Sequence, residues 1–341
     1  MDTRHFKVVF DDSYQIVSVY DKENDREVIA EGGIGNEIRI YADHPDKFDN
    51  WEWQEYSLQQ QYKTVKAVSS AEVVEDGARK GIRIVRPFMK STITQIVWFY
   101  DDIAKIDFDT KVDWHQHHQM VKAAFAVDVH ADKATYEVQF GPVERPTHKN
   151  TSWDRAKFEV CAHKYADLSD GGYGVALLND CKYGYDIHDN IMQLSLLKSG
   201  TEPYPDADQG EHIFTYSIYP HAGSVKESDT VELAYMLNNP MTALRATGEA
   251  SVLPETYSVA YTDKKNVILE TVKEAEESDE TVLRLYECKN IRGKVTLTLG
   301  FPASVCYLCD MLENEEKELP IVDDKVKLDI RGFEIVTLKV K

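Results

Sequence analysis

Four side chains that could bind a sugar lie close together in the segment 141–184: Arg145, His148, Asn150 and Trp153. A sugar offers hydroxyl groups to planar hydrogen-bond donors and an apolar ring face to an indole, and this segment supplies both kinds of group. Because the segment is rich in turn-forming residues, we expect the four side chains to lie in a polar loop at a strand end. The composition indicates one face of a sugar site, although polar loops with one Trp are more often structural.

A second polar group follows in the same segment. Asp180, Lys182 and Tyr183 are close in sequence and could form an adjoining loop. Pro142 and Pro146 lack a backbone N–H, so they predict that regular strand pairing is interrupted around them. The alternative role for all these polar residues is to lock turns beside large sheets.

The order of residues in this segment is more specific than its composition. Arg145-Pro146-Thr147-His148, Asn150-Thr151-Ser152-Trp153 and Phe158-Glu159-Val160 follow one another. This order resembles the C-terminal region of glycoside hydrolase family 38 α-mannosidases, in the branch of the cytosolic, vacuolar and many bacterial enzymes. The resemblance covers nearly the whole chain, including Val19-Tyr20-Asp21-Lys22, Asp49-Asn50-Trp51-Glu52, Tyr173-Gly174-Val175-Ala176, Leu237-Asn238-Asn239-Pro240 and Leu283-Arg284-Leu285-Tyr286-Glu287. Phe48 departs from it, because the family has Trp there.

The resemblance implies a retaining α-mannosidase, in which one carboxylate forms a covalent mannosyl intermediate and a second serves as acid and base. In that family the zinc ligands and both carboxylates come from an N-terminal β/α domain that precedes this region. The sequence shows no alternation of strands with helices, and no His-x-Asp pair stands in the setting of the family's zinc signature. We therefore expect no catalytic residue and no metal in this chain, inactivity on its own, and two partners: the zinc-binding catalytic domain and an α-mannoside oligosaccharide.

The resemblance also assigns residues to the rim of that site. In the family an arginine from this region reaches toward the active-site pocket, and Arg145 is its best positional match. The other expected substrate-binding or rim residues are His148, Asn150, Trp153, Asp180, Lys182 and Tyr183.

Composition excludes several partners. The chain has 341 residues, of which 43% are hydrophobic, and a net charge of -20. This charge repels phosphate backbones and anionic lipid, so we expect no nucleic-acid partner and no membrane partner. Five scattered cysteines, the absence of an apolar signal core after Met1 and the absence of a long apolar run favour a reducing, cytoplasmic location.

Local metal-like patterns are weak. His115-Gln116-His117-His118 is the densest histidine cluster, but only Asp113 stands at complementary spacing, so we favour an exposed strand end over a metal site. Cys306 and Cys309 have metal-motif spacing but lie in a strand pattern, where residues i and i+3 point to opposite faces, so we expect buried small hydrophobes.

Strand patterns fill most of the chain. Apolar and charged residues alternate almost strictly in 106–113, which predicts a strand with one wet face. So many long strands predict an all-β fold, with a large antiparallel, galactose-mutarotase-like super-sandwich at residues 1–245. The other main strands are expected at 6–10, 14–20, 36–41, 81–85, 92–100, 121–129, 136–140, 156–162, 174–178, 192–197 and 213–219.

A boundary follows the single helix pattern, Asp229 to Asn238, which Ser228 or Asp229 can cap. Periodicity is lost after Pro240, and strand patterns return, so we expect a smaller β-sandwich at residues 255–341. The acidic run 313–318 is interpreted as a solvated turn of that sandwich.

Two other classes of function remain open. The first is a stand-alone carbohydrate-binding module, and the second is a mutarotase-like sugar enzyme on a similar sandwich. A mutarotase would need a histidine and a carboxylate facing one cleft.

Overall fold

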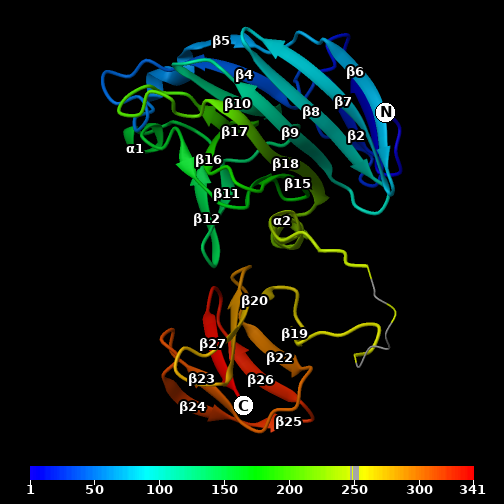
Figure 1. The fold of residues 1–341 in the computed structure, drawn as a ribbon, viewed down its shortest axis with the longest axis vertical. Coiled ribbons are helices and arrows are strands. Elements are labelled where there is room, and N and C mark those ends of the chain that lie inside the picture. Colours follow the sequence, from blue (N-terminus) through cyan, green and yellow to red (C-terminus); the bar gives the residue numbers. More distant parts are fainter. Residues whose placement is uncertain (246–247, 249–252) are drawn as a thin grey trace. The chain divides into compact units, whose positions relative to one another are not determined.

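Strands make up nearly all the regular structure of the chain (Figure 1). The computed structural model describes residues 1–245, 248 and 253–341. The all-β class predicted from the sequence is confirmed. Part of the predicted boundary between residues 245 and 255 lies outside the described residues, so that boundary stays a prediction.

Two compact units are present within the described residues. The first contains Met1–Val138 and Val143–Pro240, and the second contains Gln139–Pro142 and Met241–Lys341. Each unit has a hydrophobic core of its own.

Three sheets build the first unit, and they combine pairs of consecutive strands with pairs that are distant in sequence. The six-stranded sheet has the order β13 (Val160–Cys161), β16 (Gly184–His188), β17 (Ile191–Lys198), β10 (Gln119–Ala126), β4 (Glu37–Ala42) and β5 (Gln61–Thr64). The nine-stranded sheet has the order β12 (Gly141–Pro146), β11 (Lys133–Val138), β14 (Tyr165–Ser169), β15 (Tyr173–Asn179), β18 (Gly210–Ala222), β9 (Ile106–Trp114), β8 (Ser91–Tyr100), β7 (Arg79–Phe88) and β6 (Ser70–Asp76). A three-stranded sheet joins β1 (Phe6–Phe10), β2 (Ile16–Asp21) and β3 (Arg26–Glu27).

The core of the first unit lies between the six- and nine-stranded sheets. Phe125 of β10 packs against Phe108 of β9 and Tyr216 of β18, with ring centroids 5.5 and 6.4 Å away. A polar bridge crosses this core, because the Gln95 amide donates to the Tyr216 hydroxyl (2.7 Å) and the Asn36 amide donates to Gln95 (3.0 Å). Buried polar groups paired in this way fix one arrangement of the sheets.

Two further sheets build the second unit. The four-stranded sheet has the order β19 (Ala260–Thr262), β22 (Gly293–Leu299), β26 (Lys325–Ile330) and β25 (Ile321–Val322). The five-stranded sheet has the order β20 (Val267–Glu274), β21 (Thr281–Glu287), β27 (Ile335–Val340), β23 (Cys306–Cys309) and β24 (Glu315–Leu319). Cys306 is fully buried in the core with Leu283, Leu297 and Leu338, so it behaves as the predicted small hydrophobe.

Two strands occur where the sequence predicted interrupted pairing or a turn. Pro142 and Pro146 lie within β12, so the predicted loss of strand pairing is wrong; β12 is the edge of its sheet, where a missing N–H can face away from the ladder. The acidic run predicted to be a turn forms the edge strand β24, and its charges discourage pairing with another chain.

Helices are few and short. The predicted helix is confirmed as α2 (Thr230–Asn238), and the Ser228 hydroxyl accepts the Thr230 N–H at 3.2 Å. The sequence did not predict α1 (Ser152–Arg155) or the 3-10 helix η1 (Glu55–Gln59). The strand predicted at 156–162 shortens to β13 because the chain leaves α1 just before it.

Candidate functional site

The outer face of the six-stranded sheet carries a layer of polar side chains. Residues of β4 alternate, so that Ile38 and Ile40 enter the core while Arg39 and Tyr41 lie on the opposite face. Lys122 of β10 stands directly opposite Arg39, which places two cations side by side. This face therefore needs carboxylates to balance it.

Hydrogen bonds connect the layer across four strands. The Tyr41 hydroxyl donates to the Gln193 side-chain oxygen at 2.8 Å, and the Gln193 amide donates to Asp186 at 2.9 Å. Arg39 donates to Glu37 at 2.6 Å. Burial raises the pKa of Asp186, which is 6% exposed, although Lys122 opposes that shift.

Glu159 joins this layer from the segment that follows α1. Its carboxylate accepts hydrogen bonds from the Lys122 ammonium and from the Ser195 hydroxyl. Trp53 lies above the same face, 5.7 Å from the Lys122 ammonium and 6.2 Å from the Tyr41 ring. Side chains from residues 53 and 159 therefore contact the polar layer.

The segment 147–160 carries three of the predicted rim residues. Thr147 fixes its start, because its hydroxyl donates to the Ala131 carbonyl at 2.7 Å and its N–H donates to Asp132 at 3.1 Å. At α1 the Thr151 hydroxyl accepts the Asp154 N–H at 3.1 Å, and the Asp154 carboxylate accepts the Thr151 N–H at the same distance. This reciprocal capping starts a single helical turn at the segment's exposed tip.

Side chains on this tip face solvent. Trp153 is 79% exposed, and Asn150 is also exposed. The His148 ring lies 3.7 Å from the Asp154 carboxylate. These three predicted residues thus lie on one short segment, available to a ligand or to another protein surface.

Arg145 is on β12 rather than in a loop. Its guanidinium stacks on the Tyr136 ring at 4.7 Å, and its Nη1 atom is buried without a hydrogen-bond partner. Burial raises the pKa of Tyr136, so this ring stays a neutral phenol beneath the cation. A buried donor without an acceptor is costly and is well suited to an incoming oxygen atom.

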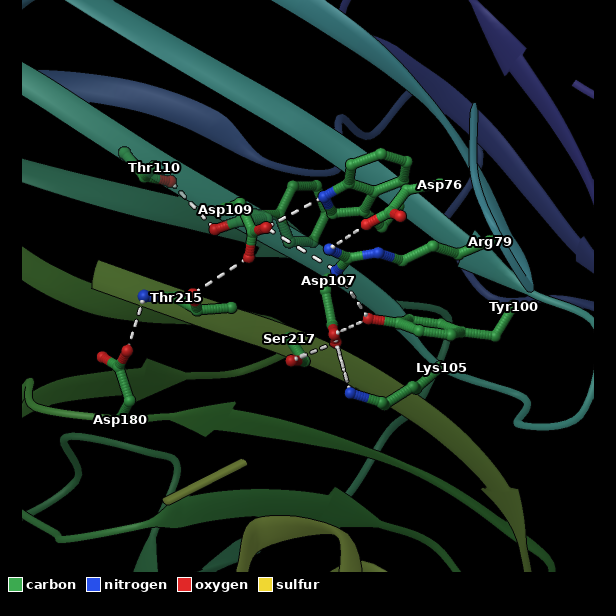
Figure 2. A network of polar contacts seen from close by, with 12 residues as sticks. Asp76, Arg79, Tyr100, Lys105, Asp107, Asp109, Thr110, Asp180, Thr215 and Ser217 are labelled. Carbon is green, nitrogen blue, oxygen red and sulfur yellow. Dashed lines mark hydrogen bonds and ion pairs between the residues drawn. The ribbon is translucent and has the colours of Figure 1, made fainter. Parts of the chain in front are cut away.

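The structure separates Asp180 from this segment. Asp180 accepts the Thr215 N–H at 2.9 Å and belongs to a polar network on the outer face of the nine-stranded sheet (Figure 2). The Lys182 ammonium lies 4.2 Å above the Phe214 ring. The Tyr183 ring contacts the His163 ring edge-on, and the Tyr183 carbonyl accepts the Ala162 N–H, so Tyr183 lies next to β13.

The network in Figure 2 was missed from the sequence. Asp107 accepts hydrogen bonds from the Ser217 hydroxyl (2.6 Å), the Tyr100 hydroxyl (2.5 Å) and Lys105 (2.7 Å). Burial, followed by the charge of Asp107, raises the pKa of Tyr100. Asp107 is only 4% exposed. The prediction that the charged face of this strand is exposed to solvent is therefore wrong at its first carboxylate. The alternation was visible in the sequence, but the long side chains that cover Asp107 come from β8 and from the turn before β9.

A cleft of 220 Å³ opens where three loops meet, and His44, Phe48 and His118 help to line it. Asp49 ties the loops together, because it accepts the N–H groups of Thr201 (2.8 Å) and Glu202 (2.7 Å) and contacts His118 Nδ1 (2.9 Å).

The histidine cluster divides between different carboxylates. His115 pairs with Asp113 at 2.8 Å, whereas His118 pairs with Asp49. The described residues contain no group of three or more histidine, cysteine or carboxylate side chains placed to hold a metal ion. These residues therefore do not fit a zinc site. None of the helices in the described part of the chain has the length and apolar character that crossing a bilayer requires.

Comparison with known proteins identifies the family. Residues 1–206 match the model of the glycosyl hydrolases family 38 C-terminal domain, and residues 266–338 match that of the family 38 C-terminal beta sandwich domain. Alpha-mannosidase 2C1 of Homo sapiens is 36% identical over 99% of this chain and 33% of its own length. Alpha-mannosidase of Saccharomyces cerevisiae is 42% identical over 60% of this chain and 19% of its own length.

A solved structure shares the fold. The crystal structure of an alpha-mannosidase from Enterococcus faecalis superposes with a TM-score of 0.81 at 16% identity, covering 100% of this chain and 42% of that one. The chain spans about a third of the length of the human relative. By both its sequence and its two matched domains, the chain belongs to glycoside hydrolase family 38 and represents the C-terminal part of such a protein.

Proposed function

We propose that this chain is the C-terminal portion of a zinc-dependent retaining α-mannosidase that hydrolyses terminal α-mannosides of oligosaccharides. The names of the curated relatives support the reaction class. The observation that supports the chain's own role is the exposed tip of the segment 147–160, where Asn150 and Trp153 lie beside and within the capped turn of α1. Indole faces and planar amides suit a sugar ring and its hydroxyl groups.

In this proposal the catalytic groups belong to the N-terminal part of the longer protein. That part would supply the nucleophile, the acid/base carboxylate and zinc, which grips hydroxyl groups of the bound mannose. This chain would help to bind and orient the sugar. Arg145 brings a buried Nη1 donor without a partner, and the loops bearing His148, Trp153 and Tyr183 would complete the rim or contact the catalytic domain.

The test uses the enzyme that contains both parts. Arg145→Ala should lower kcat/KM for a chromogenic α-mannoside about tenfold or more, since a charged donor to a substrate contributes roughly 1.5–3 kcal/mol. Arg83→Ala is the matched control, because Arg83 pairs with Glu72 on an exposed face. Unchanged kinetics in Arg145→Ala would contradict the rim assignment, and zinc-dependent turnover by the isolated chain would contradict the division of labour.

A stand-alone carbohydrate-binding module is the second candidate. Trp51 and Trp153 are 71% and 79% exposed, which favours stacking on sugar rings. Calorimetric titration of the isolated chain with mannose oligosaccharides separates the candidates, because affinity lost in Trp153→Ala would support the module.

The same proposal places the protein in the cytoplasm. All five cysteines are free thiols, two of them exposed, which suits a reducing compartment.

A further inference from the structure

Lys122 has no exposed side-chain surface. Lysine is almost never buried in this way unless its charge is paired. The partner is Glu159, 37 residues away, and the cross-strand neighbour is the cation Arg39. Because Arg39 is already paired with Glu37, removal of the Glu159 charge would leave the buried Lys122 ammonium without its hydrogen-bonded carboxylate.

The site of the Glu159 carboxylate provides both hydrogen-bond donors and space for it. One carboxylate oxygen accepts from Lys122 and the other accepts from Ser195, so both are engaged. A Cβ atom at Gly184 would lie 2.8 Å from Glu159 Oε1 and 2.9 Å from the Ser195 side chain, so glycine leaves room for the carboxylate.

Between Thr147 and Glu159, the segment 147–160 has few other contacts that hold it in place. Helix α1 has one turn and buries no residue, and a helix of that length is unstable alone. The ion pair of Arg155 with Glu55, at 3.1 Å, is exposed and contributes little. The segment is therefore held mainly at its two ends, by Thr147 at the start and by Glu159 together with the β13–β16 pairing at the end.

We propose that Lys122 is a positioning residue whose buried ion pair with Glu159 fixes the segment 148–157, and with it Asn150 and Trp153, at one place over the six-stranded sheet. The effect on the segment follows from the contacts described. The consequence for substrate binding rests on the proposed function.

Hydrogen exchange on the purified chain tests the positioning directly. In α1 the N–H groups of Arg155 and Ala156 donate to the carbonyls of Thr151 and Ser152 at 3.0 Å, so their protection reports on the segment. Lys122→Met should speed exchange in 151–157 by about tenfold or more, because loss of the lysine leaves the Glu159 carboxylate buried without its partner. Exchange at the wild-type rate would overturn the proposal.

Lys105→Met is the matched control. Lys105 is also a buried lysine paired with a carboxylate, Asp107, but it lies in the turn before β9, beside the nine-stranded sheet (Figure 2). It should leave exchange in 151–157 unchanged; an equal increase in both variants would mean general destabilisation and would overturn the proposal. If Lys122→Met does not fold, Glu159→Gln keeps the shape and removes the charge, and it should change exchange in the same direction; no change there would overturn the proposal.

Kinetics in the complete enzyme distinguish this inference from the proposed function. Lys122→Met should raise KM for an α-mannoside several-fold with a smaller change in kcat, since the segment is argued to orient substrate rather than to react. Faster exchange with unchanged kinetics would support the positioning of the segment and would contradict its role at the sugar site.

Discussion

Replacing Asp49 by Ala should loosen the end of the first unit where three loops meet. The Asp49 side chain lies in one loop, accepts two backbone N–H groups from the loop at Thr201 and Glu202, and pairs with His118 in the turn after β9. Asp49 is only 7% exposed, so water replaces these contacts only in part. The side chain therefore acts as the common fastening point of the three loops.

The expected cost follows from those contacts. Hydrogen bonds to a charged acceptor contribute about 1.5–3 kcal/mol each, but the freed N–H groups lie near the surface and can partly rehydrate. We expect Asp49→Ala to lower the free energy of unfolding of the first unit by about 3 kcal/mol and Asp49→Asn, which keeps one acceptor, by about 1 kcal/mol. Asp46→Ala, an exposed carboxylate of the same loop, should change it by less than about 0.5 kcal/mol.

Urea denaturation followed by tryptophan fluorescence measures these differences. Burial raises the pKa of Asp49, but the hydrogen bonds from Glu202, Thr201 and His118 outweigh it, so the pKa in the folded state lies below the ordinary value of an aspartate. The folded state thus binds fewer protons, and the stabilisation is present above about pH 4 and lost as the pH falls through the folded pKa. Equal urea midpoints for Asp49→Ala and Asp46→Ala at pH 7 would refute this reasoning, as would a difference between wild type and Asp49→Asn that persists at the lowest pH.

Two further outcomes are expected in the first unit. Gly81→Ala should lower the free energy of unfolding by about 2 kcal/mol, because its Cβ would lie 2.6 Å from the Val97 carbonyl oxygen and 2.8 Å from the Trp98 ring; an unchanged Tm would contradict this. Burial raises the pKa of Asp186, so the folded state holds its proton longer than the unfolded state, and stability falls as the pH rises from about 4 through that raised pKa. Asp186→Asn should remove this fall, and identical pH profiles of unfolding would argue against it.

Local patterns predicted most strands but not their partners. The residue patterns at 106–113 and 121–129 correctly indicated β9 and β10, because the apolar residues that mark a strand lie within the strand itself. The sheet to which a strand belongs depends on distant pairing, as when β10 pairs with β4 and β17. The position of β12 at the edge of its sheet also depends on that pairing and could not be read from the local pattern. Its two prolines were therefore interpreted as interruptions of strand pairing.

The candidate residues were predicted by their order, whereas their supports were not. Arg145, His148, Asn150 and Trp153 stand out in the sequence because they are polar or aromatic and close together. Lys122 does not stand out, since one lysine in an apolar strand usually marks a solvated face. Its charge is paired with Glu159, which follows α1. No periodic pattern in the sequence relates these two residues.

On the two outer faces of the first unit, buried charges are paired with partners from different parts of the structure. In the network of Figure 2, the partners of Asp107 come from the same sheet or from the turn beside it, as Tyr100, Lys105 and Ser217 do. On the six-stranded sheet the charge of Lys122 is balanced from outside the strands, by Glu159. A substitution in the first network should therefore change the sheet alone. A substitution in the second should also displace the segment that bears Trp153, which couples the sheet to the surface proposed to meet the sugar.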